Sequence, residues 1–145
     1  MSLDALYQEL ILDHAKHPHG KGLDERAAAT SHQRNPICGD EIALGVRVDG
    51  DRLVAVTWDG AGCSISQAAA SMLVALIEED DGMPRAQASA LIAAFRDALR
   101  SRGAVPLDEE TFGDAAALSG VSKYTARVKC AMLAWVALED ALARA

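Results

Sequence analysis

Two runs of alternating apolar residues meet at a tight turn within the first half of the chain. Residues 42–48 place Ile, Leu or Val at every second position, and residues 53–58 read Leu-Val-Ala-Val-Thr-Trp. The turn between them is Asp49-Gly50-Asp51. An Asp-Gly turn between alternating runs is a strong hairpin signal. The sequence therefore predicts a central antiparallel hairpin over residues 41–58, with the two outer strand ends side by side.

The segments on either side of this hairpin are mostly helical in pattern. Apolar residues recur at helical spacing in segments 3–16, 66–78 and 84–101 and in a last helix that carries Val128 to Leu142. A short edge strand has room around residues 28–33, whereas residues 103–121 are expected to be loop-like with one helical turn near 115–118. We expect residues 1–145 to form a single domain of the α+β class. In it, a small antiparallel sheet of about three strands packs against several helices in two layers.

Composition and charge exclude several classes of protein. Half of the 145 residues are apolar and 24% are charged, which favours a folded core over disorder. The formal net charge of −7 argues against nucleic acid as a partner, because phosphate binding needs a basic surface. The chain has no apolar run of 18 residues and no signal peptide pattern, so we expect no membrane span. Three cysteines cannot all pair, which favours reduced thiols in the cytoplasm.

The predicted hairpin brings two of the three cysteines together. Cys38 and Asp40 come just before the first strand, and Cys63 comes just after the second, at the start of a helix. These three residues should therefore converge at one edge of the sheet. The N–H groups at a helix start also favour a thiolate at Cys63. Cys130 lies far along the sequence, in the first turns of the last helix.

Three thiolates and one carboxylate are enough ligands for a tetrahedral zinc ion. The same residues could instead hold an iron–sulfur cluster, because soft thiolates serve both. Taken singly, each cysteine could be an inert buried side chain, and Asp40 could be a turn residue. Their joint placement at element boundaries favours the metal site. One oxygen ligand and one thiolate on a loop indicate a site from which a ligand can leave. No His-Glu-x-x-His or His-x-Glu motif is present to support zinc hydrolase or deaminase chemistry.

Three motifs resemble a known family. They are Asn35-Pro36-Ile37-Cys38-Gly39-Asp40, Gly60-Ala61-Gly62-Cys63-Ser64-Ile65-Ser66 and Arg127-Val128-Lys129-Cys130-Ala131-Met132-Leu133. In this order they resemble the U-type (IscU/NifU-N) iron–sulfur cluster assembly proteins, and most of all the SufU-like, zinc-binding sulfur-transfer branch. The similarity covers essentially the whole chain. The IscU scaffold branch differs, because it has a His before its third cysteine and a proline-rich LPPVK-type segment ahead of it. Here Lys129 precedes Cys130, and no such segment is present.

The resemblance implies a function and a set of site residues. Cys38, Asp40, Cys63 and Cys130 would bind one Zn²⁺. Cys38 would be the catalytic residue, accepting sulfur from the persulfide of a pyridoxal-phosphate (PLP)-dependent cysteine desulfurase of the SufS type. To attack that persulfide, Cys38 would leave the zinc, and a desulfurase ligand such as a His could replace it. The sulfur would pass on to a SUF scaffold complex like SufBCD. Two alternatives stay open. The first is an IscU-type scaffold that assembles a [2Fe–2S] cluster on the same cysteines. The second is a zinc-stabilised binding module without a transfer role.

Two further groups of polar residues need an interpretation. Arg127 is an auxiliary candidate that could steady the thiolates or a passing persulfide. The alternative is a solvated helix face that it shares with Lys123. The four histidines are expected to lie on solvated surface rather than to bind the metal, because the ligand set for zinc is already complete without them. These histidines are His14, His17, His19 and His32. Contact of this segment with a partner is the alternative role.

Overall fold

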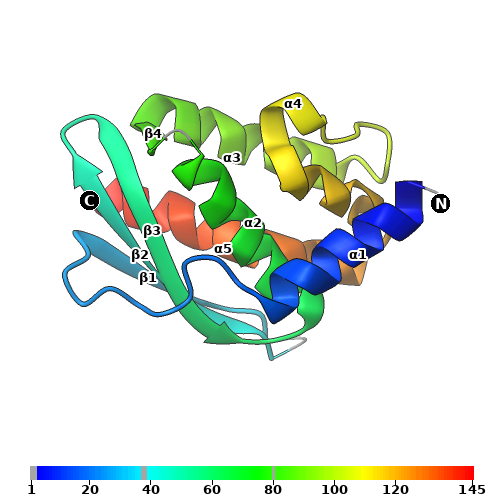
Figure 1. The fold of residues 1–145 in the computed structure, drawn as a ribbon, viewed down its shortest axis with the longest axis horizontal. Coiled ribbons are helices and arrows are strands. Elements are labelled where there is room, and N and C mark those ends of the chain that lie inside the picture. Colours follow the sequence, from blue (N-terminus) through cyan, green and yellow to red (C-terminus); the bar gives the residue numbers. More distant parts are fainter. Residues whose placement is uncertain (1–2, 37–38, 80) are drawn as a thin grey trace.

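The computed structural model describes residues 3–36, 39–79 and 81–145, and it has the predicted α+β architecture (Figure 1). Four antiparallel strands form one sheet in sequence order. They are β1 (Ala29–Arg34), β2 (Glu41–Asp49), β3 (Arg52–Ala61) and β4 (Met83–Pro84). The predicted edge strand and hairpin are confirmed. The short β4 is additional, since two residues are too few to show a strand period in the sequence.

The hairpin of β2 and β3 sets the geometry of the open end of the sheet. Its register runs from the pair Asp49 and Arg52 beside the turn to the pair Glu41 and Ala61 at the far end. The alternating residues face the core, where Leu44 and Trp58 are cross-strand partners and are almost fully buried. The register shifts by one residue near Arg47, which keeps apolar side chains of both strands on the inner face.

Helices α2 (Ser64–Glu78) and α5 (Thr125–Arg144) pack directly on the sheet. The middle of α2 is buried and built from alanines and Ser71, and small side chains let its backbone lie close to the strands. Helix α1 (Leu3–Lys16) packs beside α2, and α3 (Arg85–Arg100) packs beside α5 (Figure 1). The rings of Phe95 on α3 and Trp135 on α5 stack with centroids 3.9 Å apart and fix this second contact.

The segment expected to be loop-like between residues 103 and 121 contains more helix than predicted. A single turn, α4 (Glu109–Phe112), leads directly into the 3₁₀ helix η1 (Gly113–Lys123). The Asp108 carboxylate accepts a hydrogen bond from the Thr111 N–H at 2.8 Å and caps α4. Ala115 to Leu118 are buried in the core. The prediction was wrong here because tertiary burial, rather than local periodicity, stabilises this helix.

The described side chains bury one continuous apolar cluster, shared by the sheet and the helices. Within the described ranges, none of the helices is both long and apolar enough to cross a membrane. The open end of the hairpin lies beside the start of α2 and the first turns of α5, and that junction is where the candidate ligands lie.

Candidate metal centre

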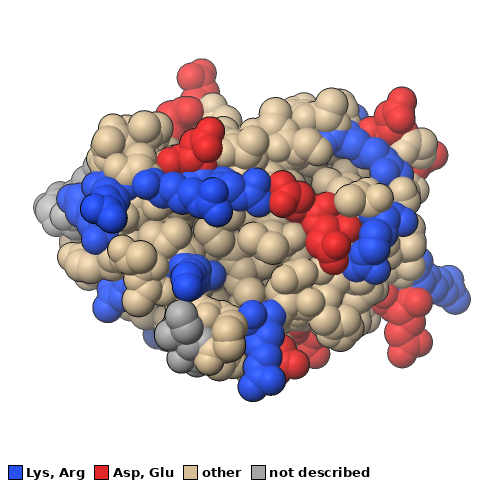
Figure 2. Space-filling view, turned by 180° about the vertical axis from the view of Figure 1, so that it is seen from behind, with Lys and Arg blue, Asp and Glu red and all other residues tan. Residues whose placement is uncertain are grey.

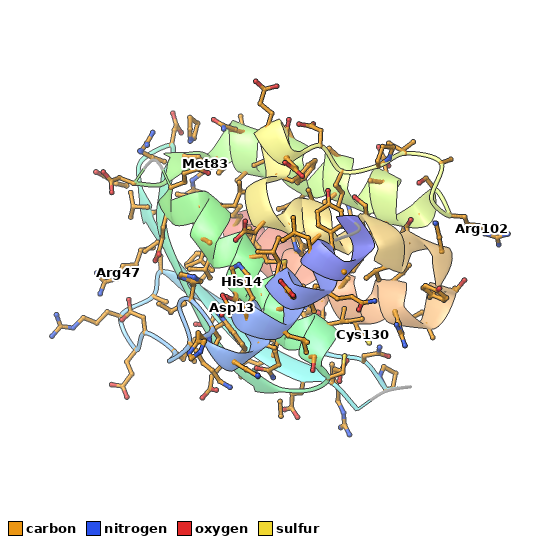
Figure 3. All side chains as sticks on the ribbon, turned by 45° about the vertical axis from the view of Figure 1, so that its right-hand side comes forward. Asp13, His14, Arg47, Met83, Arg102 and Cys130 are labelled. Carbon is orange, nitrogen blue, oxygen red and sulfur yellow. The ribbon has the colours of Figure 1, made fainter. Side chains whose placement is uncertain are left out.

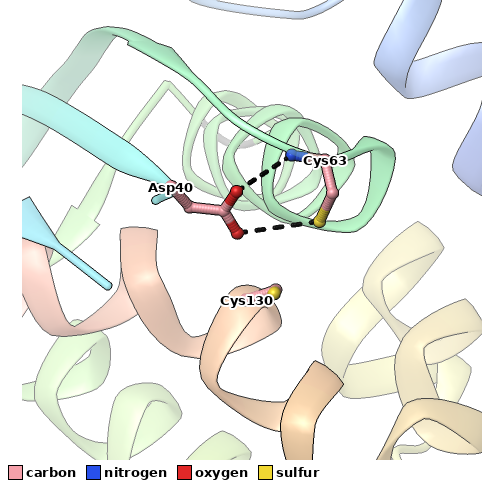
Figure 4. A group of neighbouring side chains, drawn as sticks. All are labelled: Asp40, Cys63 and Cys130. Carbon is pink, nitrogen blue, oxygen red and sulfur yellow. Dashed lines mark hydrogen bonds between the residues drawn. The ribbon is translucent and has the colours of Figure 1, made fainter. Parts of the chain in front are cut away.

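Asp40 and Cys63 meet because the hairpin pairs the residues next to them. Asp40 immediately precedes β2, and Cys63 is the N-cap residue of α2, two residues beyond the end of β3. The Cys63 N–H donates to Oδ1 of Asp40 at 3.1 Å. Oδ2 of the same carboxylate lies 3.7 Å from the Cys63 Sγ (Figure 4). The buried Asp40 carboxylate is therefore held by one oxygen while the other faces the thiol.

Cys130 completes this group from the second turn of α5. One ligand atom each from Asp40, Cys63 and Cys130 lies within 4.8 Å of the other two (Figure 4). Asp40 and Cys130 are 3% and 5% exposed, whereas Cys63 is exposed. The three residues line a solvent-open cavity with a volume of about 640 Å³. Two of the three candidate ligands are thus buried, and the third is exposed at the cavity.

The donor set fits a tetrahedral thiophilic metal. Sulfurs bound at about 2.3 Å to one tetrahedral zinc lie roughly 3.8 Å apart. The observed spread of up to 4.8 Å therefore needs only a small contraction, which side-chain rotation can supply. A mixed thiolate and carboxylate set excludes Mg²⁺ and Ca²⁺ as preferred ions, since both select oxygen ligands. Zinc and iron–sulfur chemistry both remain compatible with these three residues.

Two glycines support this arrangement, Gly62 by leaving room for the side chains and Gly39 by its backbone conformation. A Cβ on Gly62 would lie 2.6 Å from the Asp40 Oδ1 and 2.5 Å from the Ser66 Oγ, both closer than real contacts. Gly39 has a φ of +74°, which a side chain would strain. The Gly39 N–H donates to the carbonyl of Asn35 at 2.8 Å, and the Asn35 N–H donates to the carbonyl of Asp40 at 2.8 Å. These bonds hold the backbone on the approach to β2.

The structure brings together three of the four residues predicted as metal ligands. Asp40, Cys63 and Cys130 lie in one cluster. Cys38 lies outside the described residues, so its place at the centre stays a prediction. Gly39, the residue that follows Cys38 in the sequence, lines the cavity together with the three clustered ligands.

Arg127 lies at the mouth of the same cavity. It is exposed on the first turn of α5 and lines the cavity beside Cys63 and Cys130. Its guanidinium carbon lies 5.4 Å from the centroid of the Tyr124 ring, within range of a cation–π contact. Arg127 makes no ion pair within the described part of the chain. Its position suits the auxiliary role, and that role stays a prediction.

The prediction that all four histidines lie on the surface is wrong for His14. His14 is 4% exposed and links three elements from its place on α1 (Figure 3). Its Nδ1 lies 2.7 Å from the Ser71 Oγ on α2, and its Nε2 lies 2.9 Å from an Asp114 oxygen on η1. Periodicity missed this role because a buried polar bridge depends on partners far away in the sequence. The other three histidines are exposed as expected.

Comparisons with known proteins agree with this fold. Residues 6–143 match the family described as the NifU-like N terminal domain. The chain is 40% identical to the zinc-dependent sulfurtransferase SufU of Bacillus subtilis, over 99% of this chain and 93% of that protein. It is 36% identical to the iron–sulfur cluster assembly scaffold protein IscU of Streptococcus pyogenes, over 98% and 86% of the two chains. A crystal structure of a SUF-system scaffold protein (FiSufU) from Fervidobacterium islandicum superposes with a TM-score of 0.81. That chain is 31% identical, and the match covers 97% of this chain and 99% of that one.

The α+β fold of this chain is that of the IscU and SufU scaffold class, and at the open end of its hairpin the chain carries a cluster of two cysteines and an aspartate. The chain belongs to the NifU-like N-terminal domain family, and within it the chain is SufU-like. The family expected from the three sequence motifs is therefore confirmed.

Proposed function

We propose that this protein is a zinc-dependent sulfur acceptor and transferase in iron–sulfur cluster assembly. It takes sulfur from a PLP-dependent cysteine desulfurase onto Cys38 and delivers it to a SUF scaffold complex in the cytoplasm. The observation that carries the proposal is the cluster of Asp40, Cys63 and Cys130 at an open cavity. The 40% identity to a protein named as a zinc-dependent sulfurtransferase supports the same conclusion.

In the proposed site, Cys38, Asp40, Cys63 and Cys130 hold one Zn²⁺. When bound, zinc keeps its sulfur ligands deprotonated and lowers their nucleophilicity. Asp40 and Cys130 are buried, so they act as fixed ligands, and the Asp40 carboxylate is oriented by the Cys63 N–H. The exposed cation of Arg127 at the cavity mouth would attract an incoming anionic persulfide.

The transfer step is an ordinary thiolate exchange. The Cys38 thiolate attacks the outer sulfur of the persulfide on the desulfurase cysteine. A new sulfur–sulfur bond forms on Cys38 as the bond in the donor persulfide breaks. The electron pair of the broken bond leaves with the donor cysteine as its thiolate. No external oxidant or reductant is needed, since one persulfide replaces another.

The second candidate function is a scaffold that assembles a [2Fe–2S] cluster on the same cysteines. The 36% identity to a protein named as an IscU scaffold favours it, as does a thiolate set that suits either use. The two candidates differ in what the purified protein contains. One zinc per chain without sulfide supports transfer, whereas iron with acid-labile sulfide and visible colour supports the scaffold.

The experiment that tests the transfer proposal compares the wild-type protein with Cys38→Ser. We expect the wild type to gain the mass of one sulfur atom on Cys38 when incubated with the desulfurase and cysteine. It should also accelerate sulfide release by the desulfurase, whereas Cys38→Ser should do neither. Ser89→Ala, which changes an exposed residue of α3 outside the cavity, is the control and should behave as the wild type does. Undiminished acceleration by Cys38→Ser would contradict the proposal.

A further inference from the structure

A second concave surface lies beside the metal centre, between the end of β1, helix α3 and helix α5. This groove has a volume of about 510 Å³, which is within the range of pockets that hold small ligands. Its floor is apolar and comes from one face of α5. The side chains on this floor are Val128, Met132, Leu133 and Val136. Val128 and Val136 are only partly buried, so the floor offers apolar contact area to an occupant.

The rim of the groove is strongly cationic. Arg34, Arg96, Arg100 and Lys129 line it, and the described lining residues include no carboxylate. Arg96 is paired with Glu139 at 2.8 Å. Arg34, Arg100 and Lys129 make no ion pair among the residues that the structure describes. Figure 2 shows a row of Lys and Arg side chains on one face of the molecule, with Asp and Glu side chains above it and at one end and uncharged surface below it.

This gathering of cations is not a consequence of overall composition. The chain carries 21 acidic and only 14 basic residues, so a randomly chosen patch would be acidic on balance. Cations held together without local counter-charges repel one another, and an anionic occupant removes that cost. An apolar floor under a cationic rim fits a protein segment that carries both acidic and apolar side chains.

The groove is continuous with the sulfur-transfer site through two stretches of backbone. Asn35 and Pro36 line the groove, and the Asn35 backbone bonds to both Gly39 and Asp40 of the metal-centre cavity. On α5, Lys129 lines the groove and the next residue, Cys130, lines that cavity. A single partner that reaches the cavity can therefore cover the groove as well.

We infer that the groove is the docking surface for an acidic, apolar segment of the protein that donates sulfur to this site. The inference rests on the proposed function, since it takes the cysteine desulfurase as that donor. The apolar side chains of the segment contact the α5 floor, and its carboxylates face Arg34, Arg100 and Lys129. Docking there brings the donor persulfide toward Cys38. The groove residues then set the affinity for the partner, while the residues of the metal centre carry out the sulfur transfer.

The test measures binding of the PLP-loaded desulfurase from the same organism by calorimetry at low and at high salt. The groove variant is the double substitution Arg34→Gln with Arg100→Gln. The matched control is Arg26→Gln with Arg102→Gln, which removes the same charge from two exposed cations outside the groove. We expect the groove variant to bind roughly tenfold more weakly than wild type at low salt, with a smaller difference at high salt. The control should stay within about twofold of wild type.

Zinc content and thermal unfolding of each variant show whether its fold and metal centre are intact. Equal loss of affinity in both double variants, or no loss in the groove variant, would overturn the inference. An absence of binding by the wild type would overturn it too. If the wild type binds through the groove without sulfur appearing on Cys38, the docking surface stands and the proposed transfer function fails. If transfer proceeds with affinity unchanged in the groove variant, the function stands and the docking surface fails.

Discussion

At the scale of single residues, the metal centre depends on the absence of a side chain at Gly62. A Cβ there would push against the Asp40 carboxylate at 2.6 Å and the Ser66 hydroxyl at 2.5 Å. We expect Gly62→Ala to lower the free energy of unfolding by about 1–3 kcal/mol through overpacking. Displacing Asp40 should also weaken zinc binding by about 10–100-fold, as other losses of ligand support do. Competition with a chromophoric chelator measures that affinity.

The control for this substitution is Gly120→Ala. No heavy atom lies within 4 Å of a Cβ built on Gly120, and its φ lies outside the left-handed region. Its zinc affinity and unfolding midpoint should match those of the wild type. Zinc binding by Gly62→Ala as tight as that of Gly120→Ala would show that the Asp40 carboxylate has room to move without cost.

The closeness of two candidate ligands, Asp40 and Cys63, could be predicted at the residue scale because the hairpin joins their positions. The pairing of Glu41 with Ala61 follows from the Asp-Gly turn, and it places Asp40 beside Cys63. The convergence of Cys130 was not derivable from spacing alone, since it requires the packing of α5 on the sheet. Its place at an element boundary and the resemblance to a family suggested that step, and the structure brings Cys130 within 4.8 Å of the other two residues.

At the scale of elements, His14 connects α1 to the rest of the molecule. It lies buried between the Ser71 hydroxyl of α2 and the Asp114 carboxylate of η1. His14→Ala should lower the free energy of unfolding by about 2–4 kcal/mol, because it leaves a cavity and removes one of the two partners of the buried Ser71 hydroxyl, which keeps its bond from the His19 N–H. Urea unfolding measures this change. The exposed His17, one turn later in sequence, is the control, and His17→Ala should cost at most about 0.5 kcal/mol. Similar costs for the two variants would refute a bridging role for His14.

Asp140 joins α5 to β1 and makes this contact sensitive to acid. The Ser31 hydroxyl and the Arg144 guanidinium both donate to it, and these bonds lower the pKa of Asp140 from its ordinary 3.8. Because the folded pKa is the lower one, the stabilisation is complete above about pH 4 and is lost as the pH falls through the folded pKa. Asp140→Asn should therefore be less stable than the wild type at neutral pH. The two proteins should converge in acid.

Urea unfolding at a series of pH values tests this convergence. Asp13→Asn, a change at an exposed carboxylate of α1, controls for the loss of one negative charge. It should show a smaller difference from wild type at neutral pH than Asp140→Asn does. A difference between Asp140→Asn and wild type that stays constant down to low pH would mean that the Asp140 charge does not contribute to the contact.

Helices and strands with a strong local sequence pattern were predicted well, and those with a weak pattern were not. Helix α3 was expected at 84–101 and spans Arg85–Arg100, because its apolar stripe repeats over four turns. Strand β4 was missed because it exists only through pairing with Arg52 and Leu53. Of the helical segment η1, only the turn near 115–118 was expected, because alanines without a clear period become buried only in the folded protein. The groove between β1, α3 and α5 has no sequence signature, since its sides come from three distant segments.

At the scale of the whole molecule, the metal and the apolar core contribute separately to stability. Metal supplies most of the folding energy of small zinc domains, which unfold when it is removed. This chain instead buries one continuous core that extends over the sheet and the helices. We therefore expect the chelated protein to keep its fold at 25 °C. Zinc at about a thousandfold excess over its Kd should add about 4 kcal/mol. That gain corresponds to a rise of about 8–16 °C in Tm.

Circular dichroism of the protein before and after chelation and zinc return measures both parts of this expectation. Cys130→Ser is the control, since it removes one buried ligand and should abolish the zinc-dependent rise in Tm. A chelated protein without helical signal at 25 °C would mean that the metal, rather than the core, holds the fold together. Zinc would then be required for folding. Release of Cys38 from the zinc during each sulfur transfer would then destabilise the folded protein. Retention of the fold without metal would allow the proposed site to change its ligands and return.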